Sequence, residues 1–484
     1  MDCIFAIQFW KGSLTMDWKV IKENNVPIYL CIMRYIMQQI QTGQLLPGER
    51  LPSERKLADL IGVNRSTIVR VMTELEAKGI VTRKQGSGTI ISDDKWGMLA
   101  DPVVSWHQLI QSHQPDPQQK FMSQIQQKLR ENTVIDAYSG ELPMDLVPAF
   151  DLPKTNWRDF IEEDKNQDEF GYFPLRQAIS DMIHKDYQLS LSVEQMMITS
   201  GGHQAIFLIV QTLLNSGDAI AISQPSFFYA LSLFQTAGIR LFGVPMDSEG
   251  MRVDALEDEI LKHRIKFVML NPSFQNPTGI TMSLRRRHAI IKLCRIYNIP
   301  IIEDDAFGLL SFEHENMEPP LKQLDPQNVI YIGSLSKFLG STTKIGWINA
   351  PHAVLERLAA ARQDLDLTLS IFPQVLAKDA ISDPYFPEKL TGLRAEIKER
   401  MVYFLNKIDQ KQLACYPTGG FYVWVNLNPK QNFTFQITHL LDSGILSLPS
   451  FIFGEKRPAI RLNIARLSLF EIDKLVSVLT DMLT

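Results

Sequence analysis

Cysteine is scarce in this sequence. Only four of the 484 residues are cysteine, and no two of them form a C-x-x-C pair. So few scattered thiols argue against a disulfide framework and against a zinc site, and they fit a reducing, cytoplasmic environment. The nine histidines show no metal-ligand spacing either. We therefore expect no metal centre.

Long apolar runs are also missing. No stretch approaches the roughly 18 apolar residues of a membrane-spanning helix, so we expect no membrane partner. Met1–Thr15 lacks the basic lead and the small-residue cleavage site of a signal peptide. We find no internal repeat. With 45% hydrophobic and 21% charged residues, the composition is that of an ordinary globular protein, and the length predicts two or three domains.

Basic charge is concentrated in one stretch. The chain as a whole carries a net charge of −5. Residues 48–92 nevertheless hold eight Lys or Arg against five Asp or Glu. Such an excess in one small piece is expected where only that piece meets a polyanion. The charge pattern thus indicates nucleic acid as a partner of the N-terminal part alone.

The same stretch carries the pattern of a helix-turn-helix. Apolar residues at helical spacing predict a helix over Pro27–Thr42. Ser53 is placed to cap a second helix, Glu54–Leu60. Gly62 ends that helix, and a third helix follows over Arg65–Lys78. Two helices joined by a tight turn are typical of DNA-binding heads, although such a pair is more often a solvated face.

The start of the third helix presents polar and basic side chains outward, where a recognition helix meets base edges and phosphates. These side chains are Arg65, Ser66, Thr67 and Arg70. Two short strands, Ile80–Arg83 and Thr89–Ile91, then predict a basic hairpin with a glycine-rich tip. Such a wing can press against a phosphate or enter a minor groove.

The strings L-P-S-E-R-K-L-A, G-V-N-R-S-T, L-E-A-K-G-I-V and Q-G-S-G-T follow one another within Pro27–Ile91. Together they closely resemble the GntR-type winged helix-turn-helix. The resemblance implies binding to a double-stranded DNA operator. The residues that it places at the DNA are Arg55, Arg65, Thr67, Gly86 and Gly88. One departure is Val69, where many relatives carry arginine.

A polar, proline-containing stretch separates this head from the rest of the chain. We expect helical pieces in it near Val103–Gln111 and Gln118–Arg130. The predicted boundaries are a DNA-binding domain over 16–92, a linker over 93–133 and a large domain over 134–484. A linker of this length can let two heads reach separated half-sites, and a passive spacer is an equally open interpretation.

Strands and helices alternate from residue 134 onward, which predicts an α/β fold with a mainly parallel sheet. The predicted strands are Met196–Thr199, Ala219–Ser223, Phe267–Leu270, Ile299–Ile302 and Val329–Ile332. Polar residues follow most of them directly.

Four of these polar positions have side chains suited to specific roles. Lys337, among serines and glycines past a strand end, can form an imine with an aldehyde cofactor. Asp304 can hold a pyridine nitrogen protonated, Asn276 can donate to a phenolate oxygen, and Arg461 can grip a carboxylate. Three of them also have plainer interpretations: Lys337 as a surface lysine, Asp304 as a metal- or water-binding acid, and Arg461 as part of a structural salt bridge.

A phosphate and an aromatic ring have candidate partners as well. Ser200, Gly201 and Gly202 open a predicted helix, whose free N–H groups and positive dipole end form a phosphate cradle. Phe227 follows the next predicted strand and can lie flat on a heterocycle. A tight turn and ordinary core packing are the alternatives for these two features.

The motifs S-G-G-H-Q-A, N-P-T-G, E-D-D-A-F, G-S-L-S-K, P-T-G-G-F and I-R-L-N occur in this order from residue 200 to residue 463. They resemble fold-type I aminotransferases, which have large and small subdomains. With the GntR-like head, the whole chain resembles a MocR/GabR-type regulator.

This second resemblance implies that pyridoxal 5′-phosphate (PLP) is bound as an imine on Lys337, with Asp304 at the ring nitrogen and Asn276 at the ring oxygen. It puts Arg461 on the carboxylate of an amino-acid effector. The residues that it places around the phosphate are Ser200, Gly201, Gly202, His203, Ser334 and Ser336. It also implies a head-to-tail, domain-swapped homodimer.

Three positions depart from the family pattern. Phe307 stands where the family has a tyrosine that donates to the cofactor oxygen, and Lys344 stands where an arginine clamps the phosphate. Asn166 occupies the place of a tyrosine that reaches the partner subunit's phosphate. Each hydrogen bond lost to a charged group costs about 1.5–3 kcal/mol of cofactor affinity.

Three functions follow from these observations. The first is a PLP-dependent transcriptional regulator that senses an amino acid or amine through Lys337. The second is a working aminotransferase whose DNA-binding head tunes its own expression. The third is a dimerisation scaffold that binds no cofactor. The substitutions at Phe307 and Lys344 disfavour the enzyme, and the retained Lys337, Asp304 and Arg461 disfavour the empty scaffold.

Overall fold

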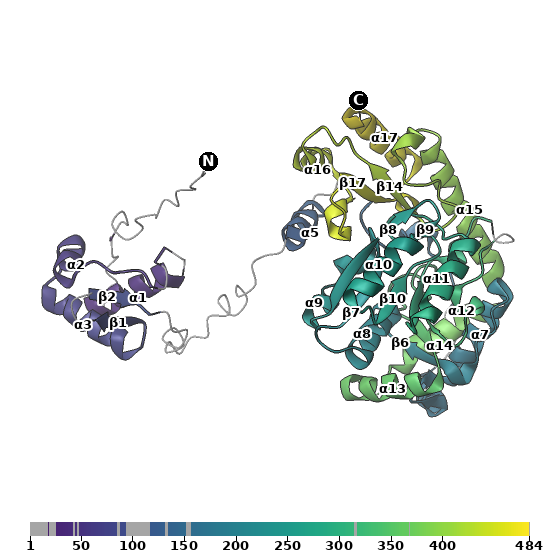
Figure 1. Cartoon of the computed structure of the whole chain (residues 1–484), viewed down its shortest axis with the longest axis horizontal. Coiled ribbons are helices and arrows are strands. Elements are labelled where there is room, and N and C mark those ends of the chain that lie inside the picture. The colour runs from purple at the N-terminus through teal and green to yellow at the C-terminus, as the bar shows by residue number, and fades with distance from the viewer. Residues whose placement is uncertain are drawn as a thin grey trace. The chain divides into compact units, whose positions relative to one another are not determined.

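The computed structural model of the chain describes residues 18, 26–41, 44–45, 48–84, 88–92, 117–130, 134–151, 156–313, 317–366 and 368–483. The chain divides into two compact units, Met1–Asp116 and Pro117–Thr484 (Figure 1). The helix expected over Val103–Gln111 lies outside the described residues.

The N-terminal unit has three helices and a two-stranded hairpin. These elements are α1 (Ile28–Gln41), α2 (Glu54–Ile61), α3 (Arg65–Ala77), β1 (Val81–Lys84) and β2 (Gly88–Ile91). Ser53 accepts a hydrogen bond from the Lys56 amide at the start of α2, and Gly62 ends that helix with φ 72°. The predicted helix-turn-helix and wing strands are confirmed.

One apolar core holds this unit together. Ile36 of α1, Leu57 of α2 and Ile68 of α3 are fully buried, and they pack with Val81 and Ile91 of the hairpin. Val81 and Ile91 also face each other as antiparallel partners. The hairpin is therefore anchored to the helices by its own side chains.

The C-terminal unit is built on an eight-stranded sheet in the order β6-β13-β12-β11-β10-β7-β8-β9. Its strands are β6 (Met196–Thr199), β7 (Ala219–Gln224), β8 (Arg240–Asp247), β9 (Gly250–Met251), β10 (Phe267–Leu270), β11 (Ile301–Asp305), β12 (Val329–Ser334) and β13 (Gly346–Asn349). The pairs among β8, β7, β10, β11 and β12 are parallel. Strand β13 runs antiparallel to both of its neighbours, β6 and β12, and β8 and β9 are antiparallel to each other.

Helices cover both faces of this sheet (Figure 1). Ile220 and Ile222 of β7 belong to one apolar cluster, which includes α8 (Gly201–Leu213) and α13 (His352–Asp366). Ala219 and Ala221 of the same strand belong to another cluster, which includes α10 (Val253–His263) and α11 (Leu284–Ile296). Alternate side chains of a strand point to opposite faces, so both faces are apolar and the strands read as continuous hydrophobic runs.

A smaller antiparallel sheet forms a second subdomain of the same unit. It comprises β14 (Tyr422–Asn426), β16 (Leu448–Pro449) and β17 (Ala459–Asn463), with α15 (Phe386–Leu405), α16 (Phe433–Asp442) and α17 (Leu469–Leu483) around it. A short parallel pair, β3 (Ile135–Asp136) and β15 (Ile445–Leu446), adjoins it. The other elements are α6 (Trp157–Glu163), β4 (Gln167–Asp168), β5 (Gly171–Tyr172), α7 (Phe173–Tyr187), α9 (Ser232–Thr236), α12 (Leu321–Leu324) and α14 (Ile371–Ile381).

Helix α5 (Pro117–Lys128) packs on this second subdomain. Its Phe121 and Ile125 are buried in the apolar cluster of the subdomain. The stretch predicted as a linker therefore includes a helix that docks on the C-terminal unit.

The start of β13 approaches the N-terminus of α8 very closely. A Cβ on Gly346 would lie 2.7 Å from the backbone carbon of Gly201 and 2.9 Å from the backbone nitrogen of Gly202. Gly346 pairs with Thr199 of β6 and with Ser334 of β12. The absence of a side chain at Gly346 thus sets how near the glycine turn comes to the carboxyl ends of its two neighbouring strands.

The described ranges contain neither a candidate membrane span nor a candidate metal cluster. None of the helices there is long and apolar enough to cross a membrane. Nor do three or more His, Cys, Asp or Glu side chains come together in these ranges to hold a metal ion.

Replacing Gly346 by alanine is expected to destabilise the C-terminal unit by about 1–3 kcal/mol, because backbone atoms must move to admit the methyl group. Urea unfolding of the full chain measures this. Gly392 of α15 has no atom within 4 Å of its Cβ position. Gly392→Ala is the matched control, and helix propensity predicts a gain of about 0.5–1 kcal/mol. Equal effects of the two substitutions would contradict the close-approach argument.

Candidate functional site

A cavity of about 570 Å³ opens at the carboxyl edge of the large sheet. Every residue that the sequence assigns to cofactor or effector lines it, although β6, β7, β10, β11, β12 and β17 contribute them separately. These residues are Ser200, Gly201, Gly202, His203, Phe227, Asn276, Asp304, Phe307, Ser334, Ser336, Lys337, Lys344 and Arg461. The parallel order of the central strands gathers their ends at one edge.

Lys337 follows β12 and reaches into the cavity. Its Nζ donates a hydrogen bond to the carbonyl oxygen of Gly140 at 2.8 Å. The same nitrogen lies 5.4 Å from the ring centroid of Phe307 and 6.0 Å from that of Phe421. The amine thus stands between a backbone carbonyl and two aromatic rings, inside the cavity.

Asp304 stands near the end of β11 and is held by one neighbour. Its Oδ2 accepts a hydrogen bond from Nδ2 of Asn271 at 2.8 Å. Loss of solvation raises the pKa of Asp304 to about 6, against which the Asn271 hydrogen bond and the charge of Lys337 act. A cation placed against this carboxylate would restore its ionised form.

Arg461 of β17 is buried, and the structure gives it no carboxylate partner among the described residues. Its Nη1 donates to Oδ1 of Asn276 at 3.0 Å and its Nη2 to the carbonyl of Tyr138 at 2.6 Å. Its guanidinium lies 4.1 Å from the ring centroid of Tyr422. Burial lowers the pKa of Arg461. An anionic ligand group would compensate this buried charge.

The phosphate candidates lie around the N-terminus of α8 and the end of β12. Gly201 has φ +80°, which a glycine adopts without strain. The Ser200 amide is bonded to Oε1 of Gln204, and Oγ of Ser334 accepts from the Ser336 amide. Lys344 is exposed and lines the same cavity. An anion there would meet a helix N-terminus and one cation.

Aromatic rings close two other sides of the cavity. Phe307 is buried against Phe421 and Tyr422, at centroid distances of 5.1 and 5.3 Å. His203 meets the ring of Phe227 edge-on at 5.7 Å. Burial, and then the charge of Lys337, lower the pKa of His203. A neutral imidazole next to Phe227 is suited to contact a flat ring.

The structure adds residues that the motifs did not reveal. Tyr138, Gly140, Asn271 and Tyr422 line the cavity, and so does Met122 of α5. A Cβ on Gly140 would lie 2.9 Å from the hydroxyl oxygen of Tyr422 and 3.7 Å from Nζ of Lys337. The only signal in the sequence was a Ser-Gly turn before a proline, and turn chemistry carries no functional assignment.

The donor set fits PLP. Oδ1 of Asn271 and Nε of Arg461 are buried and have no hydrogen-bond partner among the described residues. An amine, a buried carboxylate, an amide and a guanidinium surround one space, with a helix N-terminus at its side. The amine suits the aldehyde of PLP, the carboxylate its ring nitrogen and the amide its ring oxygen. The helix N-terminus suits its phosphate, and the guanidinium suits the carboxylate of an amino acid.

Asn166, the position where the family carries a tyrosine, lies in a short 3₁₀ turn. Its side chain is exposed and donates to Glu163 at 3.3 Å. Its expected relation to a partner subunit stays a prediction.

The recognition helix of the N-terminal unit presents the predicted polar face. Arg65 and Ser66 are exposed and Thr67 is half-buried. The Arg65 guanidinium lies 3.8 Å from a carboxylate oxygen of Glu54, a weak pairing for an exposed side chain. The Arg70 guanidinium lies 3.8 Å from the ring centroid of Tyr29 on α1. Arg65 is thus the cation at this helix start with the greater freedom to meet DNA.

The other predicted DNA contacts belong to α2 and to the hairpin. Arg55 of α2 is exposed. Gly88 begins β2 with φ +82°, and a Cβ there would lie 3.4 Å from Nε of Arg50. Gly86 lies outside the described residues.

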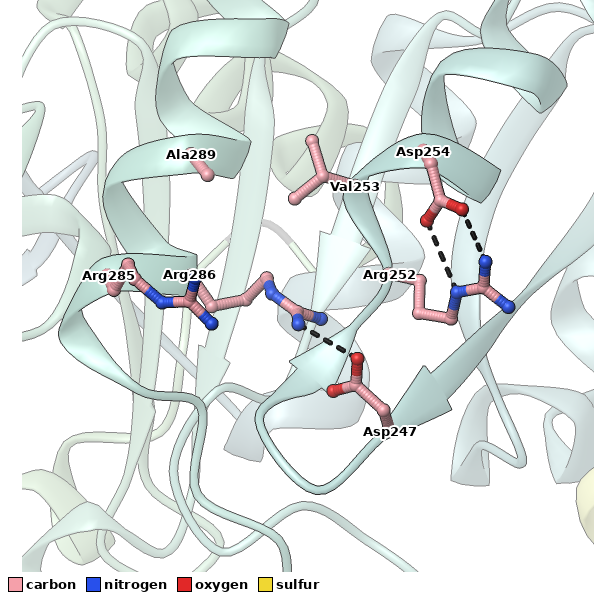
Figure 2. Close-up of a pocket in the computed structure, with 7 residues that line it drawn as sticks. All are labelled: Asp247, Arg252, Val253, Asp254, Arg285, Arg286 and Ala289. Carbon is pink, nitrogen blue, oxygen red and sulfur yellow. Dashed lines mark hydrogen bonds and ion pairs between the residues drawn. The ribbon is translucent and has the colours of Figure 1, made fainter.

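A second hollow, of about 320 Å³, lies between the start of α10 and the start of α11 (Figure 2). Its arginines are already paired: Arg286 with Asp247 at 2.9 Å, and Arg252 with Asp254. Arg285 pairs with Glu249. Cations neutralised in this way stabilise the surface and offer an anion little, so we assign no site here.

Known proteins resemble both units. The profile "Bacterial regulatory proteins, gntR family" matches residues 28–91, and "Aminotransferase class I and II" matches residues 151–479. The uncharacterized HTH-type transcriptional regulator YisV of Bacillus subtilis is 34% identical, over 94% of this chain and 96% of its own. The HTH-type transcriptional regulator NorG of Staphylococcus aureus is 30% identical, over 86% of this chain and 95% of its own. This chain belongs to the MocR-type transcriptional regulators.

Solved structures agree with the fold of the C-terminal unit. The α-aminoadipate aminotransferase LysN of Thermus thermophilus, crystallised with N-(5′-phosphopyridoxyl)-L-leucine, is 26% identical with a TM-score of 0.63. The match covers 75% of this MocR-type chain and 97% of LysN. An archaeal alanine:glyoxylate aminotransferase is 26% identical with a TM-score of 0.66, and the match covers 75% of this chain and 95% of that enzyme. The aminotransferase fold of this regulator is thereby confirmed.

The raised pKa of Asp304 predicts a pH effect on the cofactor-free regulator. The folded protein holds this proton more tightly than the unfolded chain, so stability is lost as the pH rises from about 4 to about 6. Asp304→Asn removes this loss and is expected to stabilise the cofactor-free protein at pH 7 by up to about 3 kcal/mol. Urea unfolding at pH 4 and pH 7 measures both ends. The same pH dependence in variant and wild type would contradict the prediction.

Proposed function

We propose that this regulator binds PLP on Lys337 and controls transcription in response to an amino acid or amine. The observation that carries the proposal is the convergence of Lys337, Asp304 and Arg461 on one cavity, with no carboxylate partner for Arg461 in the described residues. LysN, which holds a phosphopyridoxyl–leucine conjugate in a similar fold, supports the class of ligand.

PLP supplies an aldehyde that forms an imine with an amine, and an electron-poor ring. Lys337 would hold the aldehyde carbon, Asp304 the ring nitrogen and Asn276 the ring oxygen. The glycine turn before α8, Ser334, Ser336 and Lys344 would surround the phosphate. If an effector amine replaced Lys337 on the aldehyde carbon, Lys337 would be released as a free amine, and its Nζ would carry the two protons that the effector gave up.

Arg461 would recognise the effector by its carboxylate. A guanidinium binds a carboxylate through two parallel hydrogen bonds, and its burial strengthens that contact. Asn276 and the carbonyl of Tyr138 already orient the guanidinium. The expected effector is thus an amino acid in preference to a simple amine.

The N-terminal unit would bind an operator in the cytoplasm, with α3 in the major groove and the β1–β2 hairpin at the backbone or minor groove. A head-to-tail homodimer would bring two heads to two half-sites. Effector exchange at Lys337 would then alter DNA affinity through coupling of two distant sites. A working aminotransferase remains the second candidate, since the imine lysine and the ring carboxylate are both present.

Visible absorbance tests the cofactor. PLP-loaded wild type is expected to show a yellow imine band, and Lys337→Ala is expected to lose it because Lys344, the other described lysine of the cavity lining, is assigned to the phosphate. Lys337→Ala should also lose the effector response while its basal DNA affinity stays unchanged. Lys344→Ala is the control, with the band kept and PLP affinity lowered about 10- to 100-fold. If wild type saturated with PLP shows no such band, the proposal is wrong and the C-terminal unit is a dimerisation scaffold that binds no cofactor.

Titration of an operator fragment tests the DNA surface. Arg65→Ala is expected to weaken specific binding by about 1–3 kcal/mol and to reduce the salt dependence by about one phosphate contact. Arg70→Ala provides the comparison, since the Arg70 side chain is stacked on Tyr29. Unchanged binding by Arg65→Ala at all salt concentrations would show that α3 is not the recognition helix.

A further inference from the structure

The chain enters the C-terminal unit through a segment that also forms part of the cavity. This segment, α5 together with residues 134–141, is here called the lead-in segment. In the sequence, this segment comes directly after the stretch that connects it to the DNA-binding unit. Met122 of α5 and Tyr138, Ser139, Gly140 and Glu141 all line the cavity.

Helix α5 is docked next to the candidate carboxylate site. Ile125 is fully buried, and the ring of Phe121 meets Phe451 edge-on at 5.8 Å. Phe451 belongs to the 3₁₀ turn Ser450–Phe453. Phe453, at the end of this turn, lies 5.2 Å from the guanidinium of Arg461. This one turn therefore carries both the ring on which α5 packs and the ring beside Arg461.

Residues 138–140 are held by the cations that the cofactor and the effector would engage. Arg461 donates to the carbonyl of Tyr138 at 2.6 Å, and Lys337 donates to the carbonyl of Gly140 at 2.8 Å. Asn463 holds the Ser139 carbonyl between them at 2.8 Å. Lysine bound as an imine has no free amine for Gly140, and a carboxylate on Arg461 competes for its donors. The hydrogen bonds of the lead-in segment thus depend on what occupies the cavity.

One side of the cavity is apolar. Six lining residues lie in, or pack against, the apolar cluster of the second subdomain, and we call them the apolar wall. They are Met122, Tyr138, Phe227, Ala230, Leu448 and Phe453. None of them carries a charge. An amino acid whose carboxylate sits on Arg461, beside Phe453, would direct an apolar side chain onto this wall.

We infer that Met122 contacts the side chain of an apolar amino-acid effector, and that the lead-in segment thereby reports occupancy of the cavity to the linker. The inference rests on the proposed function, since it takes Lys337 and Arg461 as the ligand-binding cations. Met122 is the specificity-determining residue, and Phe121 and Ile125 are positioning residues that keep α5 docked.

Ligand titration tests the contact at Met122. The full-length protein is loaded with PLP, and alanine, leucine and phenylalanine are titrated while the visible band is followed. Met122→Ala enlarges the cavity and is expected to shift the ratio of leucine to phenylalanine affinity roughly tenfold toward phenylalanine. Gln126→Ala, an exposed substitution on the same helix, is the matched control and should keep the wild-type ratio. A ratio that Met122→Ala leaves unchanged overturns the contact.

Operator affinity tests the report to the linker. Ile125→Ala loosens α5 from the far side without altering a residue that lines the cavity. The amino acid is expected still to change the visible band, while its effect on operator affinity falls at least fivefold. Full wild-type coupling in Ile125→Ala overturns the inference. If Ile125→Ala melts below the assay temperature, Met122→Ala decides by its own change in coupling with leucine.

Different experimental outcomes overturn the proposed function and the role of Met122 and α5. A wild-type protein with no visible band, or with no change in operator affinity on addition of any of the three amino acids, overturns the proposed function and this inference together. A responsive wild type whose Met122→Ala and Ile125→Ala variants behave like Gln126→Ala overturns this inference alone.

Discussion

The convergence of unlike charges on one small, partly buried space is the constraint on which the C-terminal unit depends. Asp304, Lys337 and Arg461 come from different strands, and each is positioned by a neutral group, namely Asn271, Gly140 and Asn276. Neutral partners orient these side chains without satisfying their charge. A buried charge left without an ionic partner is costly, so such a cavity favours a ligand that carries the complementary charges.

Backbone geometry keeps that space open. The strands of the large sheet whose ends line it run parallel, while β13 returns antiparallel between β6 and β12. Gly346 on β13 and Gly201 on α8 let two backbones approach within contact distance. A larger residue at Gly346 would push the helix N-terminus away from the lysine loop. Packing of glycine backbones therefore sets the distance between the phosphate cradle and Lys337.

The second subdomain links that cavity to the rest of the chain. Arg461 is on β17 of the small sheet, and the same subdomain carries the docked helix α5. The strand that carries the cavity residue Arg461 and the helix that leads toward the N-terminal unit thus share one apolar core. A regulator needs such a shared element, because two sites are coupled only through structure whose arrangement both of them bias.

The sequence by itself determined the winged helix-turn-helix, five strands of the large sheet (β6, β7, β10, β11 and β12) and the thirteen motif residues that line the cavity. Apolar periodicity, capping residues and motif order are local signals, and Ser53, Gly62 and Lys337 could be interpreted from their neighbours alone. Only the tertiary structure decided which distant groups meet. It brought Tyr138, Gly140 and Tyr422 to Lys337 and Arg461, stacked Arg70 on Tyr29, and placed Met122 of a predicted linker in the cavity wall. These contacts join segments far apart along the chain, and spacing within a segment carries no information about such distances.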